Sequence, residues 1–133
     1  MLEKEMIQEK GFKNISRNGQ TTGFQVAIRT LYYRGIWASL LEGADVTVDG
    51  EKFPKEQVNW TIGSRTFTIA ELANATNVRW PFEEPAVLTI NKPGGLKPGF
   101  HSLEIAVSFR ASYMPVEMQP WVNTSTRKLV LVH

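Results

Sequence analysis

Alternation of apolar and polar residues is the main pattern of this chain, and its longest run extends from His101 to Tyr113. One face of the run takes every second residue: His101, Leu103, Ile105, Val107, Phe109, Ala111 and Tyr113. A period of two over this length predicts a half-buried strand. At about 3.3 Å per residue the strand would reach about 40 Å, so we expect it to bend or to serve two sheets.

Turn residues separate this run from further strand-like segments. The Pro93-Gly94-Gly95 and Pro98-Gly99 turns precede it, and Asp49-Gly50 predicts a hairpin turn of type I′. Clear alternation marks residues 22–33, 44–49, 58–62 and 86–90 as strands. Shorter strands are expected at residues 11–15, 51–53 and 65–67.

One short helix is predicted directly after the strand expected at residues 65–67. Thr68 and Glu71 match a capping box, and the helix would end near Asn74. Residues 79–82 should be extended, because Pro81 disfavours helix in the residue before it. Pro115 and Pro120 bracket an irregular stretch that is expected to include Trp121. The apolar run 129–132 predicts a central strand.

About eight short strands with glycine and proline turns predict an all-β fold, an antiparallel β-sandwich or jelly roll with one short helix. The 133 residues fit a single domain, 1–133. We find no internal repeat, linker or low-complexity tract in the sequence. One core should therefore serve the whole chain.

Composition narrows the classes of function. The net charge is +2 and the basic residues are scattered among acidic ones, which argues against a nucleic-acid partner. Apolar runs are shorter than the roughly 20 residues of a membrane span, and the charged N-terminal segment does not resemble a signal peptide. Cysteine is absent. We therefore expect a cytoplasmic protein without disulfides or membrane contact.

Catalytic and metal-binding patterns are weak. The two histidines, His101 and His133, have neither His-x-His nor His-Glu-x-x-His spacing, so we expect His101 to be a packed or turn residue. No catalytic residue and no cofactor are predicted for this chain. Glu83 and Glu84 leave open an independent glycosidase as a weaker interpretation, because such enzymes use paired carboxylates.

An aromatic and arginine-rich loop is the feature that we separate from the core. It contains Tyr32, Tyr33, Arg34 and Trp37, and Tyr113 and Met114 end the long strand that we expect beside it. Tyrosine, tryptophan and arginine dominate interface hot spots. These six residues are our predicted contact site for another protein, and the alternative is that the rings cap the sandwich. Trp121 is a further candidate for the same reason.

Several segments, in order along the chain, resemble the small (beta) subunit of bacterial C-glycoside deglycosidases. The order and spacing of these segments carry the resemblance. They are Gly23-Phe24-Gln25-Val26, Tyr32-Tyr33-Arg34-Gly35, Glu42-Gly43, Val46-Thr47-Val48-Asp49-Gly50-Glu51, Phe53-Pro54, Arg65-Thr66-Phe67-Thr68, Glu71-Leu72, Arg79-Trp80, Glu84-Pro85-Ala86, Lys92-Pro93-Gly94-Gly95-Leu96, Pro98-Gly99, His101 and Ser112-Tyr113-Met114-Pro115.

The resemblance implies a function shared between two chains. Family members pair with a larger alpha subunit similar to a xylose-isomerase-type TIM barrel, which carries a divalent metal, usually manganese. After a separate oxidoreductase has formed the 3-keto sugar, the heteromeric enzyme, a carbon–carbon lyase, breaks the bond to the aglycone of, for example, a flavonoid C-glycoside. Proton abstraction beside the ketone and a metal-stabilised enolate are a plausible route.

Two main functions from different classes therefore remain, with the independent glycosidase as a weaker third. The chain is either the non-catalytic beta subunit of such an enzyme or a stand-alone carbohydrate-binding module. The second interpretation rests on four tryptophans, since β-sandwiches often bind sugars by stacking them on aromatic rings.

Overall fold

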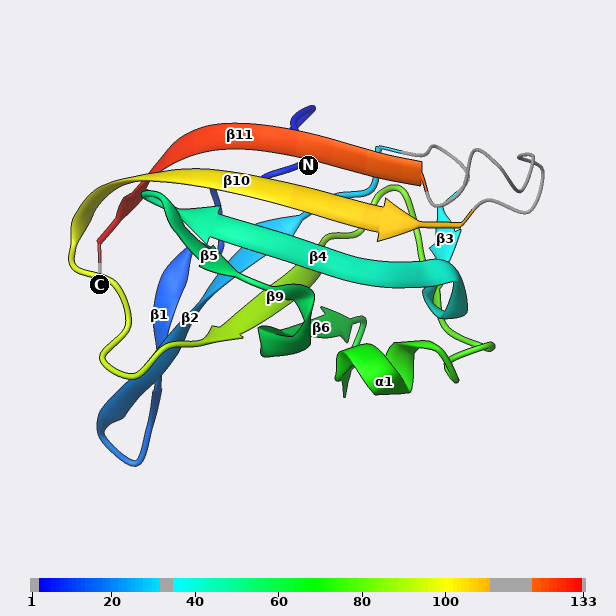
Figure 1. Ribbon diagram of the computed structural model, residues 1–133, viewed down its shortest axis with the longest axis horizontal. Helices are drawn as coiled ribbons and strands as arrows, with labels where there is room; N and C mark the ends of the chain where they lie inside the picture. Colours follow the sequence, from blue (N-terminus) through cyan, green and yellow to red (C-terminus); the bar gives the residue numbers. More distant parts are fainter. Residues whose placement is uncertain (1–2, 32–34, 111–120, 133) are drawn as a thin grey trace.

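The computed structural model describes residues 3–31, 35–110 and 121–132. Within them, two antiparallel sheets pack face to face, and a small two-stranded ladder lies at one end (Figure 1). The predicted all-β antiparallel sandwich is confirmed. None of the helices formed by the described residues has the length and apolar character that crossing a membrane requires.

The first sheet has five strands, and its inward rows are almost entirely apolar. In spatial order the strands are β1 (Lys13–Arg17), β2 (Gln20–Ile28), β9 (Ala86–Asn91), β6 (Val58–Ile62) and β7 (Arg65–Phe67). Burial alternates along β6 and β9, because successive side chains point to opposite faces of a strand. The period-two segments of the sequence therefore become half-buried strands.

The second sheet has four strands and contains the long alternating run. Its order is β11 (Trp121–Leu131), β10 (Gly99–Phe109), β4 (Leu41–Val48) and β5 (Glu51–Phe53). Asp49 and Gly50 join β4 to β5 with φ values of +51° and +88°, and positive φ at both positions is what a type I′ turn requires. The predicted hairpin is confirmed.

Short elements complete the end of the sandwich. The ladder pairs β3 (Ile36–Trp37) with β8 (Arg79–Trp80), and 3₁₀ turns η1 (Ala38–Leu40) and η2 (Lys55–Gln57) flank β4. The helix α1 (Ile69–Leu72) begins with the predicted capping box. Glu71 donates its backbone N–H to the Thr68 hydroxyl, and the Glu71 carboxylate accepts the Thr68 N–H at 2.8 Å.

Aromatic rings connect the two sheets in one continuous core. Phe24 on β2 meets Phe53 on β5 edge to face with ring centroids 5.5 Å apart, and Phe12 packs on Phe24 at 6.5 Å. Near the other end, the fully buried rings of Trp60 and Trp80 meet at 5.4 Å. Such pairs add to the burial of apolar area that holds the sheets together.

The N-terminal segment closes one side of the sandwich, which its charged sequence did not indicate. Met6 and Ile7 are buried, and Ile7 forms a β-bridge with Ile28 at the end of β2. Arg127 on β11 donates to the Ile7 carbonyl at 2.9 Å and to the Glu3 carboxylate at 2.8 Å. The hydrogen bond to the Glu3 carboxylate outweighs the effect of burial and raises the pKa of Arg127 above its ordinary value.

Three strand predictions need correction. The apolar run 129–132 is not a central strand: it ends β11, which lies at the edge of its sheet and begins already at Trp121. Leu129 and Leu131 point inward, whereas Val130 is 45% exposed on the outer face. An apolar residue on the solvent face made an alternating edge strand look like a buried one.

The boundaries of the two best-patterned strands also differ from the prediction. The strand expected at 22–33 ends at Ile28, because the Arg29 N–H turns to the Met6 carbonyl. The long strand stays in one sheet and curves (Figure 1), with a register shift at Ser108/Phe109. It leaves the ladder at Arg110, and residues 111–113 lie outside the described part of the chain.

Replacement of Thr68 by alanine should lower the free energy of unfolding by about 1 kcal/mol, because the first turn of α1 loses its cap. Ser64→Ala, in the exposed turn between β6 and β7, is the matched control and should change it by less than about 0.5 kcal/mol. Urea denaturation measures both. An equal effect of the two substitutions would contradict the capping role of Thr68.

Candidate functional site

The end of the sandwich at β3 and β8 holds the one predicted contact residue that the structure describes. Trp37 is 46% exposed, and the Arg79 guanidinium lies 5.8 Å from the centre of its ring. Gly35 leads into β3 with φ +75°, and a Cβ there would come within 2.8 Å of the Trp80 carbonyl oxygen. A side chain at position 35 would therefore strain the entry into this ladder, and glycine avoids that strain.

The other five predicted contact residues, Tyr32, Tyr33, Arg34, Tyr113 and Met114, lie outside the described residues. Leu31, which precedes Tyr32, is exposed, as is Trp37. Large exposed apolar side chains therefore lie on both sides of positions 32–34 in the sequence. We call the described part of this region, Leu31, Trp37 and Arg79, the end surface. An exposed tryptophan beside an arginine is the composition typical of a protein contact.

The tryptophans are divided between core and surface. Trp60 and Trp80 are fully buried, and the Trp80 indole N–H donates to the Glu84 carbonyl at 3.0 Å. Trp37 is exposed, and the side chain of Trp121 lies outside what the structure describes. Two of the four rings that suggested sugar stacking are thus structural.

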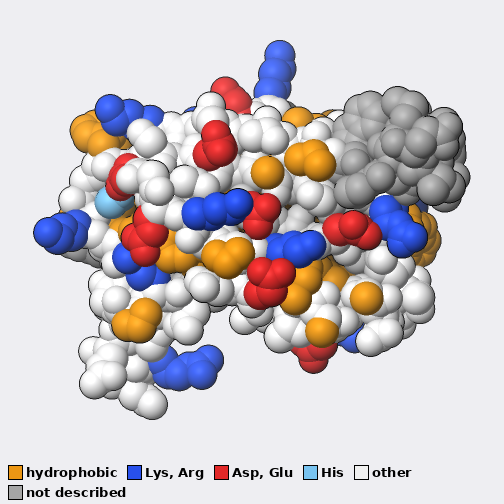
Figure 2. Space-filling model, in the orientation of Figure 1, with side chains coloured by type: hydrophobic (Ala, Val, Ile, Leu, Met, Phe, Trp, Pro, Cys, Tyr) orange, Lys and Arg blue, Asp and Glu red, His pale blue; other side chains and the backbone are white. Residues whose placement is uncertain are grey.

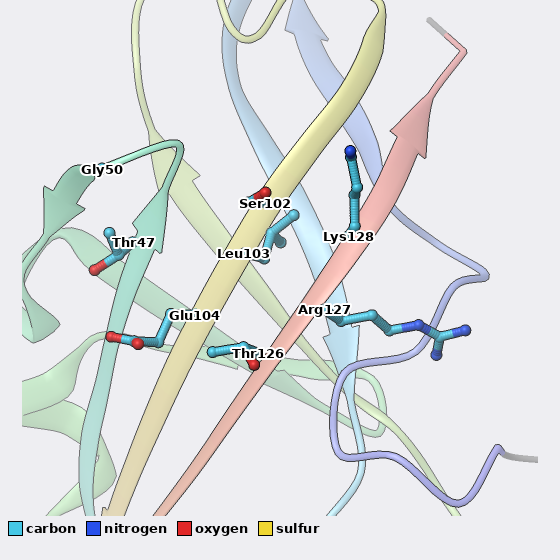
Figure 3. A pocket seen from close by; sticks show the side chains of 8 residues that line it. All are labelled: Thr47, Gly50, Ser102, Leu103, Glu104, Thr126, Arg127 and Lys128. Carbon is cyan, nitrogen blue, oxygen red and sulfur yellow. The ribbon is translucent and has the colours of Figure 1, made fainter.

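A groove of about 500 Å³ crosses the outer face of the four-stranded sheet (Figure 3). In the ladder, Glu104 on β10 lies between Thr47 on β4 and Thr126 on β11. Lys128 and Ser102 line the same groove, whereas Figure 3 shows the Arg127 side chain leaving it toward the N-terminal segment. Lysine, arginine and acidic side chains are interspersed over this face (Figure 2).

The groove does not have the donor set of a glycosidase. Glu104 is the one carboxylate among its lining residues, and hydrolysis of a glycosidic bond generally needs two at a defined separation. Glu83 and Glu84, considered above, are adjacent exposed residues of a turn. The chemistry that the groove offers is hydrogen bonding, the carboxylate of Glu104 and the ammonium of Lys128.

His101 is a packed histidine, as expected. It begins the inward row of β10 and is 9% exposed, with the Phe12 ring against it at 6.2 Å. Its Nδ1 lies 2.6 Å from Oδ2 of Asp49, and its Nε2 lies 2.6 Å from the Lys97 carbonyl oxygen. Both ring nitrogens therefore face acceptors, and neither is directed at open space.

A manganese ion does not fit the described part of this chain. Its histidine, aspartate and glutamate side chains nowhere form a group of three that could hold a metal ion. His101 in addition has both nitrogens engaged. We derive no reaction step through a metal in this chain.

One exposed aromatic residue was not among the residues predicted from the sequence. Phe100, at the start of β10, is 70% exposed and faces outward opposite Val130, with the Lys128 ammonium 5.4 Å from its ring. The signal was present, because Phe100 shares the register of Ser102 and Glu104 on the polar face of the alternating run.

Comparison with known proteins identifies the family. Residues 2–113 match the family model described as "C-glycoside deglycosidase beta subunit". A protein of that name from Eubacterium cellulosolvens is 38% identical over 130 residues, covering 97% of this chain and 88% of the relative.

More distant relatives have similar names. A C-glycoside deglycosidase beta subunit of Arthrobacter globiformis is 35% identical over 79 residues, covering 59% of this chain and 58% of the relative. A 3'-dehydrocarminate deglycosidase beta subunit of a Microbacterium species is 28% identical over 116 residues, 86% of each chain. These names describe one subunit of an enzyme that has another. The chain belongs to the C-glycoside deglycosidase beta subunit family.

Proposed function

We propose that this protein is the non-catalytic beta subunit of a heteromeric C-glycoside deglycosidase, a carbon–carbon lyase acting on a 3-keto C-glycoside. The observation that carries this proposal is the similarity to the Eubacterium cellulosolvens beta subunit over 97% of the chain. The partner is a larger alpha subunit with a TIM-barrel fold and a divalent metal, manganese in most family members. We place the metal and the bond-breaking step in that partner.

The role of this chain is to bind and support the alpha subunit. The end surface is the contact that we assign, with Trp37 as its anchor and Tyr32, Tyr33, Arg34, Tyr113 and Met114 as the further residues proposed from the sequence. Burial of a half-exposed indole beside an arginine contributes strongly to association, because the indole covers a large area for the little side-chain entropy that it loses.

Trp37→Ala should weaken association with the alpha subunit by at least about tenfold, since anchor residues of this type contribute more than about 1.4 kcal/mol. The measurement is the dissociation constant of the purified subunits by calorimetry, after co-expression has shown that they co-elute. Phe100→Ala is the matched control, because Phe100 is the more exposed ring and lies at the opposite end of β10 from β3 (Figure 1).

Equal loss of affinity in the two variants, or none in Trp37→Ala, would contradict the assignment of the end surface. Separate elution of the two subunits with no gain in activity on mixing would contradict the proposed function itself. Saturable quenching of tryptophan fluorescence by glycosides in the isolated chain would instead favour the carbohydrate-binding module.

Titration of the isolated chain with MnCl₂ should leave the ring signals of His101 unbroadened in NMR spectra, because the two acceptors hold both ring nitrogens. Paramagnetic broadening reports any Mn²⁺ close to a ring, even at low occupancy. Selective loss of the His101 signals would show a metal site in this chain and would overturn the division of labour proposed above.

A further inference from the structure

A group of three residues joins three separate parts of the fold at the end of the sandwich opposite β3. His101 comes from the start of β10, Asp49 from the β4–β5 turn, and Lys97 contributes its backbone carbonyl from the loop 92–98. We call this group the clasp. The two contacts of the imidazole ring are both 2.6 Å, and the other oxygen of Asp49 accepts the Ser102 N–H at 2.8 Å.

The protonation state of His101 follows from its partners. A carboxylate oxygen and a carbonyl oxygen are both acceptors, so each ring nitrogen must donate for both contacts to form. Neutral imidazole has one N–H, whereas the imidazolium cation has two. The clasp is complete only when His101 carries a positive charge.

Loss of one proton would break a particular contact. Asp49 is negatively charged, so the N–H that faces it is retained, and Nε2 is the nitrogen that gives up its proton. Its lone pair would then face the Lys97 carbonyl oxygen at 2.6 Å, which is repulsive. The loop 92–98 is therefore the part of the clasp that neutral His101 would release.

Further contacts couple this loop to the body of the protein. Leu96 is buried, its N–H donates to Oδ1 of Asn14 at 2.9 Å, and its carbonyl accepts from Nδ2 of Asn14 at 2.8 Å. Asn14 lies on β1, so the loop joins the five-stranded sheet to the clasp. A shift of Lys97 would therefore also displace the backbone amide of Leu96, the preceding residue.

The charged groups around the clasp favour the cation. Asp49 is the charged group that acts on His101, Lys128 on β11 acts on Asp49, and the neighbour from the β1 side is the uncharged ring of Phe12. The ion pair between Lys92 and Glu51, at 3.0 Å, connects the other end of the loop to β5.

We propose that the clasp is a proton-dependent latch, which holds the loop 92–98 against the β4–β5 turn while His101 is protonated and loosens that loop when the proton is lost. This property concerns the isolated chain and is independent of the proposed enzymatic function.

The direction of the pH dependence follows from the two titrating groups. Burial disfavours the His101 cation, but the Lys97 carbonyl and Asp49 outweigh it and raise the pKa of His101 above its ordinary 6.5. Its stabilisation is complete below 6.5 and is lost as the pH rises through the raised value. The Ser102 N–H and His101 lower the pKa of Asp49 below 3.8, so its contribution is present above 3.8 and is lost as the pH falls through the lowered value.

The latch can be tested by titration of His101 in NMR spectra, with His133→Gln to assign the signals, together with hydrogen exchange of the Leu96 amide. We expect His101 to titrate above pH 6.5. We also expect the protection of Leu96, corrected for the intrinsic rise of exchange with pH, to fall over the same range. Titration at or below 6.5, or constant protection of Leu96, would overturn the proposal.

Two variants separate the latch from a merely structural role. Asp49→Asn keeps an acceptor for Ser102 and tolerates the positive φ of this turn, but it removes the charge and should shift the His101 midpoint downward. Lys97→Gln is the matched control, since Lys97 acts through its backbone carbonyl, and it should not lower the midpoint. An unchanged midpoint in Asp49→Asn would contradict the proposed latch.

Discussion

Burial of two apolar strand faces against each other is the constraint on which the rest of this structure depends. Phe24 meets Phe53 across the two sheets, and Trp60, Trp80 and Phe24 are among the largest fully buried side chains of the core. Loss of one such side chain typically costs about 3–5 kcal/mol, a large part of the stability of a small domain. The inward half of every long strand is therefore committed to the core, and binding must use outward rows, strand ends and loops.

The outward surfaces differ in what they offer another molecule. The groove around Glu104 is polar and lies on a face with charges of both signs. Exposure of such a surface to water has little free-energy cost. The end surface presents Trp37 and Leu31, two large apolar side chains whose area a partner would remove from water. Family membership supports another subunit as that partner, and so the physical and the comparative arguments point to the same role.

Local features of the fold could be predicted from sequence, because they depend on neighbouring residues. The period of two, the Asp49-Gly50 turn and the Thr68–Glu71 capping box are of this kind. Pairing across the chain could not be predicted. The bridge from Ile7 to Ile28 and the contacts of Arg127 with Ile7 and Glu3 join residues whose own neighbourhoods carry no sign of each other.

The candidate site shows the same division. The sequence indicated that Trp37 lies at the surface and that His101 is packed, since both follow from local pattern, but Trp37 lies in strand β3 and not in the predicted loop. It could not indicate that Arg79 lies beside Trp37, or that Asp49, 52 positions earlier, binds His101. Electrostatic surroundings are set by such distant partners, so the two acceptors that face the His101 ring became visible only in three dimensions.

Cleavage of a 3-keto C-glycoside by each subunit alone and by their mixture tests the central claim most directly. The account predicts that this chain alone is inactive and that the rate of the alpha subunit rises when the chain is added. Cleavage by this chain alone, or a mixture no faster than the alpha subunit by itself, would contradict it.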